Sequence, residues 1–499
     1  PREIVDEISR SFDFLETEMH DVPERQRSLR AVFEYSWNLL SEQERTLFAQ
    51  FSIFRGGFTR NAALRITGTN LRALTLLVNK SLLRRDNESG RYEIHELLRQ
   101  YAEEKLAQSA ELDAAYDAHS RYYLEMVVQL TPKLKGFGQL EALNLIDTDF
   151  ENIRVAWNRA VERRDAALVE QAIEGLYLYL TFRNRMMDGQ QVFGLARQAW
   201  KAEGDAPTLL AGRLLVRFPQ GQPLAQYRTG LEIAQRCGDA REIAFCQRLI
   251  GHWISHTEYN QDDGVPLLEA SLSGYRALGD KFYAAQVLDD LGWSHMLMFD
   301  VLNQQPLVRE SLSLRREIGD KIGTANSLRN LGGSSGGFFD SSDRAIGYWE
   351  EAKGIAYEMK DRLGVAWNAS LQASNLIYKA EYDRADVLLD EAYPHAADIN
   401  DPVVKGFIIL ERACIAGLRD EDYTRARRLI DEGFPPDAPP DFRISFASFA
   451  MTIVACGLRN FETFRPYYTV FFEAMPFFRD DFFLPILLPN RLVQLFERG

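Results

Sequence analysis

Apolar and polar positions follow a helical period through much of the second half of the chain, in segments that come in pairs. Residues 264–280 (GVPLLEASLSGYRALGD) and 345–361 (AIGYWEEAKGIAYEMKD) each form an amphipathic segment that ends in aspartate. A second helical segment follows each aspartate, as in 281–296 and 362–378. Amphipathic segments of this length predict helices with one buried face. The pattern therefore predicts pairs of helices that meet at an aspartate.

The aspartate recurs at a nearly constant interval. Its spacings are 41, 40, 41 and 40 residues, at Cys237-Gly238-Asp239, Leu278-Gly279-Asp280, Ile318-Gly319-Asp320, Met359-Lys360-Asp361 and Ile399-Asn400-Asp401. A fixed period in this range is typical of a solenoid, in which stacked helix pairs expose one long concave surface. We expect a mainly α fold whose second half is a right-handed α-solenoid built for binding.

Small side chains recur in phase with the aspartate. Nine residues before it stand Gly230, Ser271, Ser311, Ala352 and Ala392, and twelve residues after it stand Gly251, Gly292, Gly332, Ala373 and Ala413. Glycine, alanine and serine let neighbouring helix backbones approach where a larger side chain would hold them apart. We expect these ten side chains to lie between packed helices.

The helix after the aspartate resembles the first helix of the tetratricopeptide repeat, on the dipeptides Ile250-Gly251, Leu291-Gly292 and Leu331-Gly332. Later copies depart to Gln372-Ala373 and Arg412-Ala413, and the period exceeds the usual 34. In that family the first helix lines the concave face. We take the small residue as the position that packs against the neighbouring helix, which places a set of mostly polar residues on the concave face. We predict that an inducer or partner binds these residues: Arg248, His252, Gln286, Asp289, Trp293, Asn326, Arg329, Trp367 and Ser370. The alternative is a solvated interior that holds no specific ligand.

Two local features of the repeats suggest other chemistry. The run Gly332-Gly333-Ser334-Ser335-Gly336-Gly337 lies inside a predicted helix, and we expect it to end that helix early rather than to cradle a phosphate. His252 and His256 lie four residues apart, with His295 in the next repeat. A metal site needs a third converging ligand, and because no acidic residue stands in register we expect no metal.

Residues 26–106 show a different pattern. Amphipathic helices are predicted at 27–40 and 42–51, the second with a capping box of Ser41 and Glu44. A helix at 71–81, a short hairpin turning at 87–90 and a closing helix from His95 complete the segment. Helices followed by a two-stranded wing predict a winged-helix domain, which by default suggests DNA binding. Six basic and six acidic residues between Lys80 and Lys105 balance each other, so the wing suits phosphates poorly.

Composition narrows the choice of function. The 499 residues carry a net charge of -14, which argues against a general nucleic-acid binder. No apolar run is long enough to span a bilayer, and no signal peptide follows Pro1. The four cysteines have no metal or disulfide spacing and are expected to be small buried residues of a cytoplasmic protein. Because Pro1 begins inside a helical pattern, we expect the chain to be part of something longer.

The sequence between residues 23 and 105 resembles the winged-helix module of STAND signal-transduction ATPases, such as the AfsR-type and maltose-activator-type regulators. The resemblance lies in 23–30 (PERQRSLR), 35–40 (YSWNLL) and 51–58 (FSIFRGGF), and in 92–99 (YEIHELLR), which matches that family's MHD motif. It implies that His95 contacts the phosphate of bound ADP in the resting state. The alternative is a histidine that caps the closing helix. Residues 147–157 (DTDFENIRVAW) are similar to the family's helical arm.

These observations divide the chain into five parts. We expect the tail of a preceding module at 1–25, a winged helix at 26–106, a helical arm at 107–205, the repeats at 206–434 and an aromatic-rich cap at 435–499. No G-x-x-x-x-G-K-[ST] loop is present, so we expect no enzyme activity and no cofactor in the chain itself, with ADP or ATP bound by the full-length protein. The predicted function is the sensor and autoinhibitory part of a STAND ATPase, whose partners are an inducer and its own nucleotide-binding domain. The alternatives are a protein-interaction scaffold and a DNA-binding winged-helix regulator.

Overall fold

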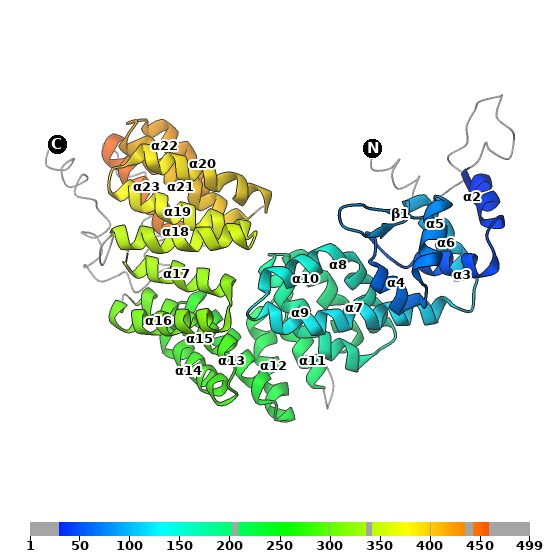
Figure 1. The fold of residues 1–499 in the computed structure, drawn as a ribbon. Coiled ribbons are helices and arrows are strands. Elements are labelled where there is room, and N and C mark those ends of the chain that lie inside the picture. Colours follow the sequence, from blue (N-terminus) through cyan, green and yellow to red (C-terminus); the bar gives the residue numbers. More distant parts are fainter. Residues whose placement is uncertain are drawn as a thin grey trace. The chain divides into compact units, whose positions relative to one another are not determined.

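A computed structural model describes residues 29–201, 208–298, 300–335, 342–399, 401–434 and 443–458. Within these residues the chain forms 22 helices and one two-stranded sheet, so the expected mainly α fold is confirmed (Figure 1). The chain divides into two compact units. The first unit holds residues up to 134, 141–179 and 187–202, and the second holds 135–140, 180–186 and the residues from 203 onward.

The first unit begins with five short helices and a hairpin and continues with four longer helices. The elements are α2 (Leu29–Asn38), α3 (Glu42–Phe51), α4 (Arg60–Thr67), α5 (Leu71–Asn79), β1 (Arg84–Arg85), β2 (Tyr92–Glu93), α6 (Glu96–Ala107), α7 (Leu112–Leu134), α8 (Gln139–Glu162), α9 (Ala166–Phe182) and α10 (Met186–Ala199). The capping box of Ser41 and Glu44 is present at the start of α3. Helix α4 was missing from the sequence-based prediction, although Thr59 caps it through the backbone N–H of Ala62.

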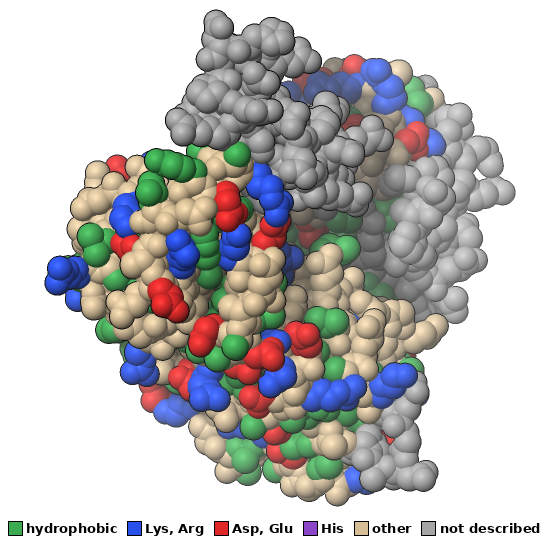
Figure 2. All heavy atoms as spheres, turned by 90° about the vertical axis from the view of Figure 1, so that its right-hand side faces the viewer, with side chains coloured by type: hydrophobic (Ala, Val, Ile, Leu, Met, Phe, Trp, Pro, Cys, Tyr) green, Lys and Arg blue, Asp and Glu red, His purple; other side chains and the backbone are tan. Residues whose placement is uncertain are grey.

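The hairpin pairs two short strands, with Arg84 opposite Glu93 and Arg85 opposite Tyr92. Phe58 adds a bridge to Tyr92, and Gly57 permits this approach because a Cβ there would lie 2.9 Å from the Tyr92 carbonyl oxygen. On the face shown in Figure 2, Lys and Arg side chains are interspersed with Asp and Glu. The hairpin itself holds three arginines and three acidic residues between positions 84 and 93, the mixed charge that its sequence predicts.

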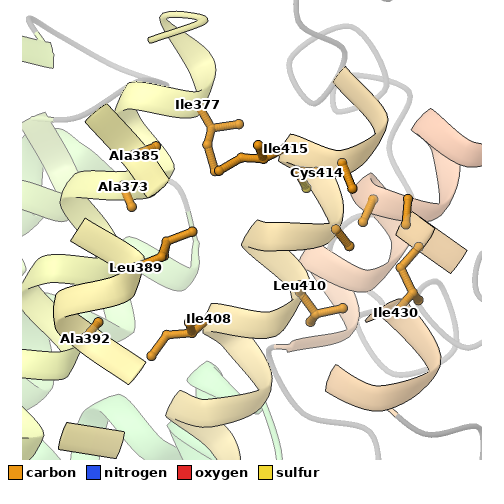
Figure 3. Close-up of a cluster of buried hydrophobic side chains, with 14 of the residues drawn as sticks. Ala373, Ile377, Ala385, Leu389, Ala392, Ile408, Leu410, Cys414, Ile415 and Ile430 are labelled. Carbon is orange, nitrogen blue, oxygen red and sulfur yellow. The ribbon is translucent and has the colours of Figure 1, made fainter. Parts of the chain in front are cut away.

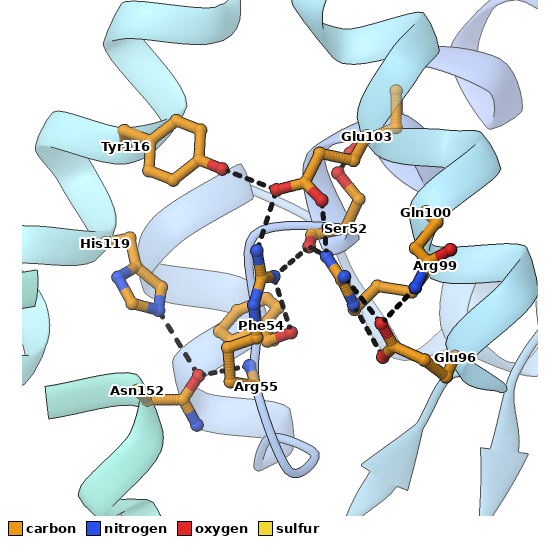
Figure 4. Close-up of polar contacts among 11 residues, drawn as sticks. Ser52, Phe54, Arg55, Glu96, Arg99, Gln100, Glu103, Tyr116, His119 and Asn152 are labelled. Carbon is orange, nitrogen blue, oxygen red and sulfur yellow. Dashed lines mark hydrogen bonds and ion pairs between the residues drawn. The ribbon is translucent and has the colours of Figure 1, made fainter. Parts of the chain in front are cut away.

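A polar network joins the loop after α3 to three later helices of the first unit (Figure 4). The Arg55 guanidinium donates to Glu103 at 2.7 Å, and the Arg55 backbone N–H donates to the Asn152 side chain at 2.7 Å. Burial by itself would raise the pKa of Glu103, but Arg55 and Arg99 lower it below its usual value. Burial also lowers the pKa of His119 to about 3, so this histidine is neutral where it meets Asn152. The network therefore links α6, α7 and α8 without leaving a buried charge unpaired.

The second unit is a row of antiparallel helix pairs. Its helices are α11 (Leu209–Val216), α12 (Pro223–Cys237), α13 (Ala240–His256), α14 (Gln261–Ala277), α15 (Lys281–Leu297), α16 (Val301–Ile318), α17 (Lys321–Ser335), α18 (Ser342–Glu358), α19 (Arg362–Tyr378), α20 (Tyr382–Asp398), α21 (Pro402–Leu418), α22 (Tyr423–Gly433) and α23 (Arg443–Leu458). Each helix packs against the next one in sequence. This is the arrangement of a tetratricopeptide-like solenoid.

The recurring aspartate begins a helix in every repeat. We call α13, α15, α17, α19 and α21, which follow it, the A helices, and α12, α14, α16, α18, α20 and α22 the B helices. The aspartate side chain accepts a hydrogen bond from a backbone N–H in the first turn of its A helix, at Asp239, Asp280, Asp320, Asp361 and Asp401. Aspartate is a strong N-cap because it satisfies a free N–H at a helix start. The marker of the repeat is therefore a helix cap.

The ten small residues in phase with the aspartate are all buried, as predicted. A Cβ at Gly292 would lie 2.4 Å from Val308 Cγ2, and one at Gly332 would lie 2.3 Å from Trp349 Nε1. Ala373 and Ala392 are fully buried in the hydrophobic core that α19 to α23 share (Figure 3). Helices in this unit thus approach at distances that only small side chains allow.

Two segments from earlier in the chain belong to the second unit. The Gln139 side chain donates to Asp320 Oδ1 at 2.9 Å and accepts from the Ile322 backbone N–H at 3.0 Å. The Phe137 N–H donates to the Ile318 carbonyl at 3.0 Å. These bonds attach residues 135–140 to the end of α16 and the start of α17.

Three segments named in the sequence analysis lie at the limits of the described residues or beyond them: the glycine-rich run, the first 28 residues and the aromatic stretch near the C-terminus. Helix α17 is described as far as Ser335, and Gly336 and Gly337 lie outside the described residues, so the expected early end of this helix remains a prediction. Residues 1–28 and the aromatic stretch 466–478 also lie outside them.

Two of the four cysteines, Cys246 and Cys414, are buried as expected, but Cys237 is exposed. Among the described helices, none combines the length and apolar character needed to cross a membrane.

Candidate functional site

The A helices form one layer of the solenoid. α13 touches α15, α15 touches α17 and α19 touches α21, whereas among the described helices no two consecutive B helices are in comparable contact. Closer spacing of the A helices places them on the inner side of a curved stack, as the tetratricopeptide resemblance implies. Every residue predicted to bind an inducer lies on α13, α15, α17 or α19.

The polar residues on α13 converge on one carboxylate of α15. Arg248 Nε donates to Asp290 Oδ2 at 2.7 Å, and His252 Nδ1 lies 3.1 Å from Asp290 Oδ1. His256 Nε2 lies 3.1 Å from the Asp290 carbonyl oxygen and 3.2 Å from Ser294 Oγ. Burial by itself would raise the pKa of Asp290, but Arg248 and the histidines lower it below its usual range. The His252 side chain is 48% exposed and remains accessible to a ligand.

Asp289 does not face the inner surface, in contrast to the prediction. It is buried, and its Oδ2 accepts from Arg315 at 2.7 Å and from Ser327 Oγ at 3.0 Å. Arg315 also donates to the cap Asp320 at 3.0 Å. Burial raises the pKa of Asp289 to about 6 despite Arg315. Because its bonds join α15, α16 and α17, Asp289 serves packing between repeats.

Ser370 is also buried, again in contrast to the prediction. Its hydroxyl and that of Ser374 donate to the carboxyl group of Glu411 on α21. Burial raises the pKa of Glu411 to about 8, so its carboxyl group is mostly protonated at neutral pH. Ser370 therefore belongs to a contact between α19 and α21.

Arg329 is the predicted charged residue whose side chain makes no bond to the described part of the protein. In the described part of the chain its guanidinium makes no hydrogen bond or ion pair, although Asp289 and Asp361 are close enough to act on it electrostatically. Burial lowers its pKa. Gly333, one turn later on α17, faces open space, because a Cβ there would meet no atom within 4 Å. An unpaired guanidinium beside open space is suited to an anionic group of a ligand.

The other predicted binding residues are partly exposed. Trp293 is exposed on α15, and Gln286, Asn326 and Trp367 are partly buried. The Trp367 ring packs against Phe407 with a centroid distance of 5.6 Å. With Arg248, His252 and Arg329, these residues are the predicted ones that keep accessible surface on the A helices.

His95 stands at the start of α6 in the first unit. It is exposed, and its side chain makes no hydrogen bond to the helix start. The alternative of a capping histidine is therefore not supported. The side chain remains available for a contact from outside.

Sequence reasoning missed Asp290, Arg315 and Glu411, which organise the polar contacts between repeats. Their partners lie between 5 and 42 residues away on other helices. The Asp289-Asp290 pair inside an otherwise apolar helix was the available signal, since paired carboxylates are seldom buried without partners.

No protein-family model matches the chain. Three curated proteins, provisionally named HTH-type transcriptional regulators of Mycobacterium bovis and of two strains of Mycobacterium tuberculosis, are 28% identical to it over 311 residues. The match covers 58% of this chain and 35% of each relative, so the chain spans about a third of the length of these distant homologues.

Among solved structures, the Signal Transduction ATPase with Numerous Domains (STAND) protein with a tetratricopeptide repeat sensor from Pyrococcus horikoshii aligns with 96% of this chain and 68% of its own. The TM-score is 0.54 and the identity 14%, so the likeness shows the fold of a STAND-like tetratricopeptide sensor region. A Rap protein complexed with Competence and Sporulation Factor covers 75% of the chain at 11% identity, and its TM-score of 0.48 is too low to support an argument.

Proposed function

We propose that this chain is the sensor and autoinhibitory portion of a STAND-type signalling protein, in which an inducer binds the inner face of the A helices. The fold shared with the Pyrococcus horikoshii protein supports the class, and the mycobacterial homologues support a link to transcriptional regulation. Because the chain spans about a third of those relatives, nucleotide binding and oligomerisation belong to the proposal for the full-length protein.

One observation carries the ligand-binding part of the proposal. Arg248 and Asp289 have partners inside the protein, whereas the guanidinium of Arg329 has none among the described residues. An unpaired charge in a partly buried position costs free energy that a bound anion would recover. The negative charges of Asp289 and Asp361 also act on the Arg329 guanidinium and would repel a bound anion. A carboxylate with one negative charge therefore fits this position better than a phosphate dianion.

The resting state is the second part of the proposal. Helices α2 to α6 with the β1–β2 hairpin act as a winged helix, and His95 contacts the phosphate of ADP held by the nucleotide-binding domain. The exposed, unbonded side chain of His95 fits this contact. The chain itself contains no phosphate-binding loop, so we expect it to hydrolyse no ATP alone.

Such a switch works only if the inducer binds the active state better than the resting state. A shift from mostly resting to mostly active protein requires a difference of about 10⁴-fold in affinity. Equal affinity for the two states would leave the equilibrium unchanged.

The test uses the whole chain and a small-molecule extract analysed by affinity-selection mass spectrometry. We expect a carboxylate-bearing compound to be retained by the wild-type chain and lost by Arg329→Ala. Arg316→Ala is the matched control, because it removes the same charge from an exposed ion pair with Glu351 on a B helix. If no compound depends on Arg329, the small-molecule sensor is contradicted. A protein partner lost by the same variant would instead favour the interaction scaffold.

A further inference from the structure

Two histidines and one carboxylate converge where α13 meets α15. One ligand atom from each of His252, His256 and Asp290 can be chosen so that all lie within 4.8 Å of one another. The histidines are one helical turn apart with ring centroids 4.1 Å apart, and Asp290 follows 34 residues after His256. The helix that carries the histidines offers no third ligand, which is why the sequence predicted no metal. The neighbouring repeat supplies it.

The chemistry of the three groups fits a transition metal. Two imidazole nitrogens and one carboxylate oxygen form the ligand set of many three-residue zinc sites, in which water occupies the remaining position. Imidazole ligands favour zinc, copper and nickel over magnesium and calcium, which prefer oxygen. His252 is half exposed, so solvent and an ion can reach the cluster.

The surroundings of Asp290 leave one oxygen for an ion. Arg248 Nε bonds to Oδ2, so Oδ1 is the oxygen that faces His252. Metal-binding carboxylates are commonly held by a hydrogen bond of this kind to their other oxygen. The positive charge of Arg248 repels a cation, but the Asp290 carboxylate already offsets this charge by pairing with Arg248. Ser294 Oγ, 3.2 Å from His256 Nε2, helps to position the buried imidazole.

We propose that His252, His256 and Asp290 form a binding site for one divalent transition-metal ion of the zinc class, which bridges two neighbouring repeats. The ion would tie α13 to α15 on the same inner face that carries Arg329. The inference does not depend on the proposed sensor role, because metal binding is measured directly on the chain.

The experiment uses the full chain without a polyhistidine tag, treated with a chelator and then titrated with Co²⁺ and Zn²⁺. We expect about one ion per chain by calorimetry, a visible Co²⁺ absorption spectrum, and its displacement by Zn²⁺ but not by Mg²⁺. His252→Ala and Asp290→Asn should each weaken binding at least about tenfold. His252 is exposed and asparagine keeps the shape of aspartate, so both variants should fold, which circular dichroism checks.

His295→Ala is the matched control. His295 Nδ1 lies 3.1 Å from Asp300 Oδ2, a histidine–aspartate pair of similar geometry, and among the described residues no third ligand joins it. We expect this variant to bind as the wild type does. Absence of saturable Co²⁺ and Zn²⁺ binding by the wild-type chain would overturn the proposal, and so would unchanged affinity in His252→Ala. Loss of binding in His295→Ala alone would place the ion elsewhere.

Discussion

At the scale of single residues, the repeats are held together by buried polar side chains whose partners lie on other helices. Glu411 accepts hydrogen bonds from Ser370 and Ser374 and has no ion-pair partner among the described residues. Arg315 bonds to both Asp289 and Asp320. Groups of this kind are costly when one partner is removed.

Glu411 should make the stability of the second unit depend on pH. Its pKa is raised from 4.5 to about 8 in the folded chain, so its stabilising contribution is full below about pH 4.5 and declines as pH rises to about 8. Glu411→Gln keeps an acceptor for the serine hydroxyls and removes the titration. We expect the fall in melting temperature between pH 5.5 and 8.5 to be smaller in this variant. The exposed Glu310→Gln is the control, and an equal fall in Glu411→Gln and wild type would contradict the role of Glu411.

Loss of the Arg315 side chain should lower the free energy of unfolding far more than loss of the neighbouring Arg316 side chain. Arg315→Leu leaves Asp289 and Asp320 buried without the guanidinium, and losing one partner of a buried ion pair costs about 3–5 kcal/mol. Arg316→Leu breaks an exposed pair with Glu351 and should cost at most about 1 kcal/mol. Urea unfolding measures both. Similar losses in the two variants would show that the buried network contributes little.

At the scale of helices, each repeat depends on a cap and a close contact. The aspartate caps the A helix, and the small residues set the distance between helices. Four of the five A helices, α13, α15, α19 and α21, have the same length of 17 residues. Local signals of this kind lie within one helix and its ends, so the sequence alone reveals them.

Two glycine substitutions should have opposite effects on stability. Gly292→Ala would place a Cβ 2.4 Å from Val308 Cγ2, and overpacking of this kind costs about 1–3 kcal/mol. Gly354→Ala on α18 meets no atom within 4 Å and should stabilise the helix by about 0.5–1 kcal/mol. Thermal unfolding of the two variants checks this. Stabilisation by Gly292→Ala would show that α15 and α16 can move apart at no cost.

At the scale of the whole molecule, the chain combines a helical unit that carries a mixed-charge hairpin with a unit of stacked helix pairs. Its fold agrees with that of a STAND-like sensor region, while its distant homologues carry the name of transcriptional regulators. The name of the homologues refers to a DNA-binding motif without assigning it to the third of their length that this chain matches. Charge offers a direct test.

We expect the chain not to bind DNA in a salt-sensitive way. Its net charge is -14, and a protein that contacts several phosphates must present a basic surface. A gel-shift assay with a random duplex at about 50 and 200 mM salt measures this. A complex at the lower salt that dissociates at the higher one would favour the DNA-binding regulator. Reversal of the charges at Arg84 and Arg85 would then show whether the exposed strand β1 is responsible.

By itself the sequence determined the helices, their caps and the period of the repeat, because these depend on side chains within one or two turns of each other. It also identified the small residues that lie between helices, since their recurrence reports a constraint shared by every repeat. The tertiary structure decided which polar residues of the A helices remain accessible. Asp289 and Ser370 pack between repeats, whereas the Arg329 side chain makes no bond to the described residues. This difference depends on partners on other helices, and the pattern of a single helix does not contain the placement of its neighbours.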